Sequence, residues 1–296
     1  PAVTPSEHFN TVLYTGTGAS NAITGVGFEP DMSWFKRRDS TGAHVMADTL
    51  RGDSAVIYPS EVDGEYTAGG EGFLSLDSDG FTVDGGGSGG NVNVSTGTYV
   101  AWNWKANGAG ASNSEGSRTA TVSANVDAGF SIVGFEGESG GTVGHGLSKA
   151  PEIVIMKNRD ATDDWNVRYG LQDGTSDYMK LSGREGKTDS SIALPSATLI
   201  NLGTAASEGG QSGEDYIAYC FHSVEGFLKC GMYVGNNSDD GTFVYLGFRP
   251  AYVCVKNTHG WGGQWVTHDS VRSTYNPSQK ALFLDRNYDE DTSTDY

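Results

Sequence analysis

The chain has 296 residues, and its 37 acidic residues outnumber its 19 basic residues to give a formal net charge of −18. An acidic surface repels nucleic acids and anionic membranes, so we expect neither a nucleic-acid partner nor membrane insertion. No apolar run approaches the roughly 18 residues that span a bilayer, and no signal peptide opens the chain. Together with Pro1, which suits removal of an initiator methionine, this pattern favours synthesis in a cytoplasm without export.

Short runs of β-type composition follow one another along the chain, separated by Gly, Asp, Asn and Ser. No long run has the apolar spacing of a helix, and 43 glycines are too many for long helices. We therefore expect an all-β fold, with strands joined by turns into sandwiches or barrels. The predicted strands are, in chain order, Thr11–Tyr14, Met32–Lys36, Phe81–Val83, Tyr99–Trp104, Ile132–Phe135, Ile153–Lys157, Tyr216–Phe221 and Tyr252–Lys256.

One pattern occurs three times. A proline precedes a short apolar strand that carries a lysine six positions after the proline, at Pro30–Lys36, Pro151–Lys157 and Pro250–Lys256. Repetition at a period of about a hundred residues indicates one structural unit copied in tandem. We expect jelly-roll-like sandwich modules joined by short linkers. The predicted organisation is a first β module at residues 1–106, a linker or edge strand at 107–128, a second module at 129–223, and a third at 224–296 that is incomplete at its C-terminal end.

Other features recur with the same period. Each repeat begins with a phenylalanine, Phe9, Phe130 or Phe227, and the first and third share the motif Asp-[Thr/Ser]-[Leu/Val]-Arg at 48–51 and 269–272. A polar turn and then a strand that holds a bulky residue and a valine come after each lysine. Trp165 and Trp265 align at this place and are predicted to be core residues, while His44 is the bulky residue of the first repeat.

Alternating aromatic residues close the first two repeats, at Tyr99–Trp104 and Tyr216–Phe221. Counted from its proline, the third repeat needs such a strand at roughly position 315, beyond Tyr296. A sheet edge without it would pair readily with other strands. Either the sequence is an ordered fragment of a longer polypeptide, which we favour, or another chain donates the strand. The acidic tail Asp285–Tyr296 is expected to form a loop rather than pack in a core.

The three cysteines, Cys220, Cys230 and Cys254, are odd in number and have no C-x-x-C spacing, which argues against a disulfide framework or a zinc site. Cys220 and Cys254 lie in apolar strand-like runs and are predicted to be buried. Lys36, Lys157 and Lys256 suggest either a repeated ligand contact or, as we favour, lysines at strand ends or sheet edges that discourage edge pairing.

No residues form a recognisable catalytic or metal motif. There is no H-E-x-x-H motif and no nucleophile elbow, so we assign no catalytic, cofactor-binding or metal-binding residue and expect no cofactor and no enzyme activity. The run Asp77–Gly80 resembles the start of a calcium loop but lacks the further ligands, so we predict a turn. Trp261 and Tyr275, which lie in predicted loops, are candidates for surface recognition because aromatic rings stack on sugars.

Residues 9–39 resemble the opening of a repeat family found in virion proteins of marine tailed bacteriophages, whose members are described as structural or tail-fibre-like. Residues 112–133 resemble the connector of that family, 144–160 its second unit and 245–256 its third. In that family the third unit closes with a further strand rich in Tyr and Phe, from which this sequence departs. The resemblance covers nearly the whole chain and implies no catalytic residues.

The resemblance implies a structural protein of a phage virion, assembled in the host cytoplasm. We expect a tail fibre or appendage that displays loops for attachment to the host surface. The expected partners are other virion proteins, further copies of the chain in a homo-oligomer such as a trimer, and a glycan or protein receptor on the host. The alternatives are a capsid decoration or head-fibre protein and, with less support, a tailspike-like enzyme that cleaves glycans.

Overall fold

The computed structural model describes residues 3–53, 55–67, 72–85, 92–238, 240–260, 263–275 and 278–293. Over these residues it consists of β-strands, loops and two short 3-10 helices, Pro5–Glu7 and Ala206–Glu208. Neither of these helices is long or apolar enough to cross a membrane. The predicted all-β fold is confirmed, and each of the eight predicted strands lies within an observed strand.

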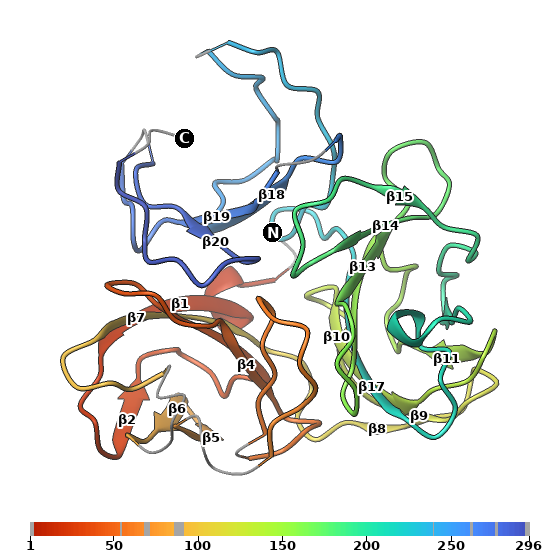
Figure 1. Cartoon of the computed structure of the whole chain (residues 1–296), viewed down its shortest axis with the longest axis horizontal. Coiled ribbons are helices and arrows are strands. Elements are labelled where there is room, and N and C mark those ends of the chain that lie inside the picture. Colours follow the sequence, from red (N-terminus) through yellow and green to blue (C-terminus); the bar gives the residue numbers. More distant parts are fainter. Residues whose placement is uncertain are drawn as a thin grey trace.

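Residues 3–106, the first segment, contain two antiparallel sheets (Figure 1). The larger sheet has the strand order β1-β7-β3-β4, and the smaller has the order β2-β6-β5. Asp77 pairs with Gly80 across the connection between β5 and β6, so the predicted turn is confirmed. The strands are β1 (Phe9–Thr15), β2 (Asn21–Thr24), β3 (Met32–Arg37), β4 (Val45–Asp48), β5 (Phe73–Asp77), β6 (Gly80–Val83) and β7 (Thr98–Trp104).

Residues 107–223, the second segment, form an eight-stranded sheet of order β15-β14-β13-β12-β17-β10-β9-β8 and a small β11-β16 pair. The region 107–128, where an edge strand is expected, supplies β8 and β9. The strands are β8 (Ala111–Asn113), β9 (Ala120–Asn125), β10 (Phe130–Glu136), β11 (Thr142–Gly144), β12 (Ile153–Asn158), β13 (Asn166–Tyr169), β14 (Asp177–Lys180), β15 (Thr188–Asp189), β16 (Leu199–Asn201) and β17 (Asp215–Phe221).

Residues 224–293, the third segment, form one sheet of order β18-β19-β20. Its strands are β18 (Tyr252–Lys256), β19 (Trp265–Asp269) and β20 (Leu282–Phe283). The predicted module boundaries at residues 106, 128 and 223 stay a prediction.

The three segments repeat one arrangement of strands. β3, β12 and β18 each begin two residues after the repeated proline. Each pairs with the strand that follows it in the same register, so that Met32 lies opposite Asp48, Ile153 opposite Tyr169 and Tyr252 opposite Asp269. In the first two segments, the other edge of this strand pairs with the closing strand, β7 or β17.

A ring nitrogen at one repeated position joins each segment to another. The residues at this position are His44, Trp165 and Trp265. Each comes immediately before the residue that pairs with the fifth residue after the repeated proline, which is Phe35, Met156 or Val255. Each contacts a main-chain carbonyl of another segment: Trp165 Nε1 to Tyr58 O at 3.0 Å, Trp265 Nε1 to Lys180 O at 2.9 Å, and His44 Nε2 to Phe283 O at 3.0 Å. The second segment thus contacts the first, the third contacts the second, and the first contacts the third, which closes a ring (Figure 1).

His44, whose contact with the third segment closes the ring of segments, is a neutral imidazole. Trp34 Nε1 donates a hydrogen bond to His44 Nδ1 at 2.9 Å, so Nε2 carries the proton that is donated to Phe283. Burial lowers the pKa of His44 well below its ordinary value, and the nearby charge of Lys36 lowers it further. The first segment therefore reproduces with histidine the ring N–H that the other two supply with tryptophan.

Main-chain hydrogen bonds repeat with the same cyclic order. Each runs from a loop amide of one segment to the carbonyl eight residues after the proline of the next. The three bonds are Glu65 N to Arg159 O at 2.6 Å, Lys187 N to Thr258 O at 2.8 Å, and Glu290 N to Arg38 O at 2.9 Å. All three contacts between segments are therefore built on one backbone plan.

Lys36 and Lys157 are buried away from sheet edges, so the expectation is wrong for these two, whereas Lys256 is the last residue of β18, an edge strand among the described residues, and fits it. β3 and β12 are interior strands, and Lys36 and Lys157 are both 0% exposed. Lys157 Nζ donates to Val62 O of the first segment at 3.2 Å, and Lys256 Nζ donates to Gly183 O of the second at 3.3 Å. Lys157 and Lys256 therefore bridge segments, while Lys36 Nζ donates to Arg37 O within its own segment.

One hydrophobic cluster is shared by all three segments. It contains Trp34 and Trp102 from the first, Trp165 from the second, and Trp265 and Leu282 from the third. The predicted burial of Trp165 and Trp265 is confirmed. Two further clusters lie wholly within the first and the second segment. Because the central cluster crosses segment boundaries, separate jelly-roll-like sandwich modules stay a prediction.

A buried ion-pair network reinforces the contact between the first and second segments. Asp48 and Arg51, both with fully buried side chains, pair at 2.5 Å, and Tyr219 of the second segment donates its hydroxyl to Asp48 at 2.6 Å. Arg159 of the second segment binds Glu65 through two hydrogen bonds of 2.9 and 2.8 Å. The shared Asp-x-x-Arg motif thus holds a carboxylate where the neighbouring segment can reach it.

The contact between the third and first segments repeats this network. Asp269 pairs with Arg272 at 2.5 Å and accepts a hydrogen bond from Trp102 Nε1 at 3.0 Å. Arg38 of the first segment binds Glu290 at 2.8 and 3.0 Å, and Arg272 lies 3.3 Å from the same carboxylate. The described part of the acidic tail is a loop, as expected, but it is not unpacked, because it supplies the Glu290 carboxylate to the arginines of this contact.

Replacing Glu290 by glutamine should lower the free energy of unfolding by about 3 kcal/mol, because Arg38 then loses its partly buried counter-charge and Arg272 keeps only Asp269. Burial alone would raise the pKa of Glu290, but Arg38 and Arg272 hold that pKa below its ordinary value. Urea denaturation measures the loss. Glu136→Gln, at the more exposed pair with Arg118, is the control and should cost at most about 1 kcal/mol. Equal losses would refute the importance of the buried network.

Lys157 predicts a rise of stability with pH. Burial lowers the pKa of Lys157 to about 8, so the unfolded chain binds more protons than the folded chain between about pH 8 and about pH 10.5. Across that window, the free energy of unfolding should grow in wild type relative to Lys157→Met by up to about 3 kcal/mol. Denaturation at a series of pH values measures the difference. The exposed Lys229→Met variant controls for loss of one charge, and a flat difference for Lys157 contradicts the prediction.

Candidate functional site

The contact between the second and third segments keeps the backbone plan but lacks the ion-pair network. Tyr169 stands where the other contacts have Asp48 or Asp269, and Gln172 stands where they have Arg51 or Arg272. Lys187 stands where the other contacts have Glu65 or Glu290, and Thr258 stands where they have Arg159 or Arg38. The Trp265 and Lys256 hydrogen bonds described above remain. At these four positions, this contact therefore has no acid–arginine pair.

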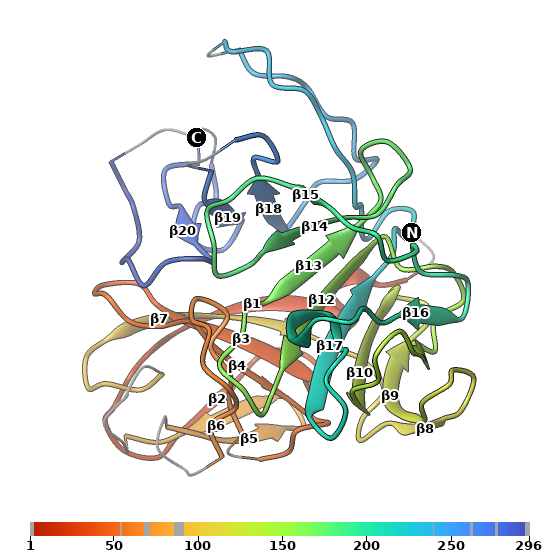
Figure 2. The ribbon, with the colours of Figure 1, turned by 45° about the vertical axis from the view of Figure 1, so that its right-hand side comes forward.

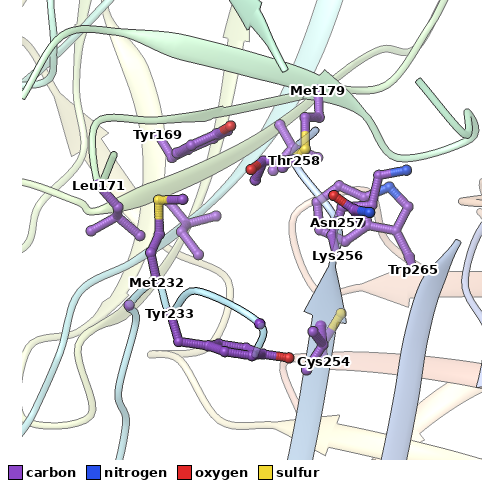
Figure 3. Close-up of a pocket in the computed structure, with 15 residues that line it drawn as sticks. Tyr169, Leu171, Met179, Met232, Tyr233, Cys254, Lys256, Asn257, Thr258 and Trp265 are labelled. Carbon is purple, nitrogen blue, oxygen red and sulfur yellow. The ribbon is translucent and has the colours of Figure 1, made fainter. Parts of the chain in front are cut away.

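A pocket of about 430 Å3 lies at this contact (Figure 3). In Figure 3, Met232 and Tyr233 of the third segment lie across the pocket from Lys256 and Trp265, while Tyr169 comes from the second segment. The pocket is lined by Ile153, Val167, Tyr169, Leu171, Met179, Gly231, Met232, Tyr233, Gly235, Cys254, Val255, Lys256, Asn257, Thr258 and Trp265.

Tyr169 places an unpaired hydroxyl at the pocket. Its side chain is 4% exposed, yet its hydroxyl oxygen has no hydrogen-bond partner among the described residues. Burial, aided by the nearby charge of Asp177, raises the pKa of Tyr169 to about 12, so the hydroxyl stays protonated at neutral pH. A buried hydroxyl without a partner costs roughly 1–3 kcal/mol. In the other contacts, the equivalent aspartate accepts a hydrogen bond from an aromatic residue of a closing strand, Tyr219 or Trp102.

The pocket lies beside an open sheet edge. Among the described residues β18 pairs only with β19, whereas β3 and β12 have partners on both sides. The stretch 229–250, which leads into β18, has no main-chain hydrogen bond to another main-chain atom in the part of the chain that the structure describes. It projects from the body of the molecule as a long loop (Figure 2). Its exposed apolar side chains are Met232, Tyr233, Val234, Phe243, Val244 and Tyr245.

The open edge explains an error in the cysteine predictions. Cys220 is buried as predicted, but Cys254 is exposed. Cys254 occupies the position of Trp34 and Ile155, which lie opposite residues of β7 and β17. Without an equivalent closing strand, the Cys254 side chain opens onto the pocket.

Of the two predicted recognition residues, Tyr275 does not line this pocket. Tyr275 lies in the loop between β19 and β20 and is 84% exposed, while Trp261 falls outside the described residues. Sequence reasoning missed Tyr169, Met232 and Tyr233. Comparison of the repeats holds the signal for Tyr169, because a tyrosine replaces the aspartate of the other two copies.

The pocket is suited to binding an apolar group. Its lining contains no carboxylate and no imidazole, and the ammonium of Lys256 already donates to main-chain carbonyls of Gly183 and Gly263. Among the described residues, no group of three or more His, Cys, Asp or Glu side chains is placed to hold a metal ion. What the pocket offers is apolar contact area, an open strand edge and one unpaired hydroxyl.

Two tyrosine variants should change stability in opposite directions. Tyr169→Phe removes a buried hydroxyl that has no partner, so the free energy of unfolding should rise by about 1 kcal/mol. Tyr219→Phe removes the hydroxyl that donates to Asp48, so the free energy should fall by about 1–3 kcal/mol. Thermal and urea denaturation of both variants provide the measurement. Destabilisation of similar size in both would mean that the Tyr169 hydroxyl is paired.

Comparison with known proteins gives one result. Residues 4–296 match the model of a domain family described as a domain of unknown function, DUF7483. No curated protein and no solved structure matches the chain. Because the matched residues span almost the entire sequence, the chain belongs to the DUF7483 family.

Proposed function

We propose that this chain is a structural protein of a bacteriophage virion, and that it serves as a tail fibre or appendage attaching to the host surface. The resemblance of residues 9–39 and 144–160 to phage virion repeats supports this role. So does the use of buried polar groups: Asp48, Asp269 and Glu290 all bind side chains of neighbouring segments. The observation that carries the proposal is this dedication of buried charge to holding three repeats in a closed ring.

Exposed aromatic side chains supply the recognition surface in this proposal. Tyr275 is 84% exposed on a loop, and Tyr245 and Phe243 are similarly exposed on the projecting loop. Aromatic rings stack on the apolar faces of sugars, so these loops suit a host-surface glycan. Single contacts of this kind are weak, and a homo-oligomer on a particle multiplies them. Other virion proteins would anchor the chain to that particle.

The proposal is tested on particles of the phage that encodes the chain. Antibodies against the chain should label the tail in immunogold electron microscopy. Adsorption of the purified chain to host cells should fall by roughly two- to tenfold in Tyr275→Ala, because the stacking ring is lost. Tyr275→Phe keeps the ring and is the matched control.

Each other result has a defined meaning. Label on the head would replace the tail-fibre role with a capsid decoration or head-fibre role. Shortened host polysaccharide after incubation with the chain would support the glycan-cleaving alternative. Absence of label from intact particles would refute the virion role.

A further inference from the structure

We infer that the space beside β18 is an acceptor site for one antiparallel β-strand, supplied by polypeptide outside residues 1–296 and patterned Tyr-aliphatic-Ala-aromatic-x-aromatic. We call this space the β18 slot; it is bounded by Tyr252–Lys256 on one side and by residues 231–235 on the other. Both walls contribute to the pocket, the first through Cys254, Val255 and Lys256 and the second through Gly231, Met232, Tyr233 and Gly235. The inference is independent of the phage role, because it rests only on the comparison of the three segments.

The first two segments define the strand that fills the slot. In each, a seven-residue strand lies between the opening strand and the proline-led strand: β7 between β1 and β3, and β17 between β10 and β12. Both carry the pattern, as Tyr99–Trp104 and Tyr216–Phe221. In the third segment the proline-led strand β18 is present with the same register toward β19, but no described strand pairs with its other edge.

The register of the bound strand follows from the other two segments. Trp34 lies opposite Trp102, and Ile155 lies opposite Tyr219. Cys254 is the equivalent of Trp34 and Ile155, so the central aromatic residue of the bound strand should lie opposite Cys254. Its neighbours in the strand then face the other side of the sheet, since side chains alternate along a strand.

The pocket fits that central aromatic residue. Trp102 and Tyr219 each reach from a closing strand to the neighbouring segment. There Trp102 donates a hydrogen bond to Asp269, and Tyr219 donates one to Asp48. The equivalent residue on the bound strand would reach Tyr169, whose buried hydroxyl has no partner among the described residues. The aromatic side chain of that residue would also cover the apolar surface contributed by Met179 and Trp265.

The opposite wall of the slot has the properties of an unpaired strand. The stretch 231–235 follows Phe227, the counterpart of Phe9 and Phe130, which begin β1 and β10. Within it, Tyr233 is 50% exposed and Val234 is 85% exposed. Strand addition would supply main-chain hydrogen bonds to both walls, and the apolar side chains would gain contacts.

The probe is a synthetic peptide with the sequence of residues 214–223, Cys220→Ser. We expect saturable binding to the chain in a fluorescence anisotropy titration, and at least roughly tenfold weaker binding of a scrambled peptide. A second peptide that also carries Tyr219→Phe should bind roughly two- to tenfold more weakly, because it cannot hydrogen-bond Tyr169. In the Tyr169→Phe protein, the two peptides should bind equally.

Disulfide trapping tests the register. In a redox buffer, a peptide carrying cysteine at the Tyr219 position should cross-link to Cys254, since directly opposite Cβ atoms in antiparallel strands lie about 4.5–5.5 Å apart. A peptide with cysteine at the Ala218 position instead should cross-link at least roughly tenfold less, because that side chain faces the other side of the sheet. The Cys254→Ser protein should form neither product.

The inference would be overturned by binding weaker than roughly 1 mM, by cross-linking that does not distinguish the two positions, or by a cross-link to another cysteine. Concentration-dependent self-association that the peptide abolishes would show that a second copy of this chain occupies the slot, and would also overturn it. Circular dichroism of the Tyr169→Phe and Cys254→Ser proteins checks that both retain the fold.

Discussion

The structure depends on a requirement that buried polar groups find partners, and here the partners lie in other segments. The ring nitrogens of His44, Trp165 and Trp265 sit in the central core, where an unpaired N–H would cost roughly 1–3 kcal/mol. Each is satisfied by a carbonyl of another segment. Because these bonds form a closed ring, separating any one segment leaves unpaired groups on two surfaces and exposes the shared hydrophobic cluster.

The same backbone frame carries different side-chain chemistry at its three contacts. Two contacts place an Asp-x-x-Arg pair beside a glutamate and a second arginine, and these groups compensate one another's burial. The third has Tyr169, Gln172, Lys187 and Thr258 at those positions. Without an acid–arginine network at those positions, and with no closing strand among the described residues, this contact holds a largely apolar pocket. The asymmetry leaves an open pocket at one of three interfaces that share a backbone plan.

The repeated lysines show how one sequence position can serve the fold in an unexpected way. Lys36 and Lys157 lie on interior strands, and burial lowers the pKa of each to about 8. Lysines tolerate such places when their stems pack on apolar side chains and their ammonium groups reach carbonyl oxygens. Lys157 reaches Val62, 95 residues away in sequence. Recurrence of a charged residue in a repeat therefore reflects the shared interface as well as the shared strand.

The sequence alone was sufficient to predict the all-β class, the eight strands and the period of the repeat, because these follow from local alternation of apolar residues and from proline and glycine positions. It also indicated a missing closing strand. Only the tertiary structure decided which groups meet across segments. Trp102 and Asp269 are 167 residues apart, and Tyr219 and Asp48 are 171 apart, so no local pattern marks either pair. The pocket at Tyr169 arises from the same long-range closure, because its walls come from different repeats and exist only once the ring has formed.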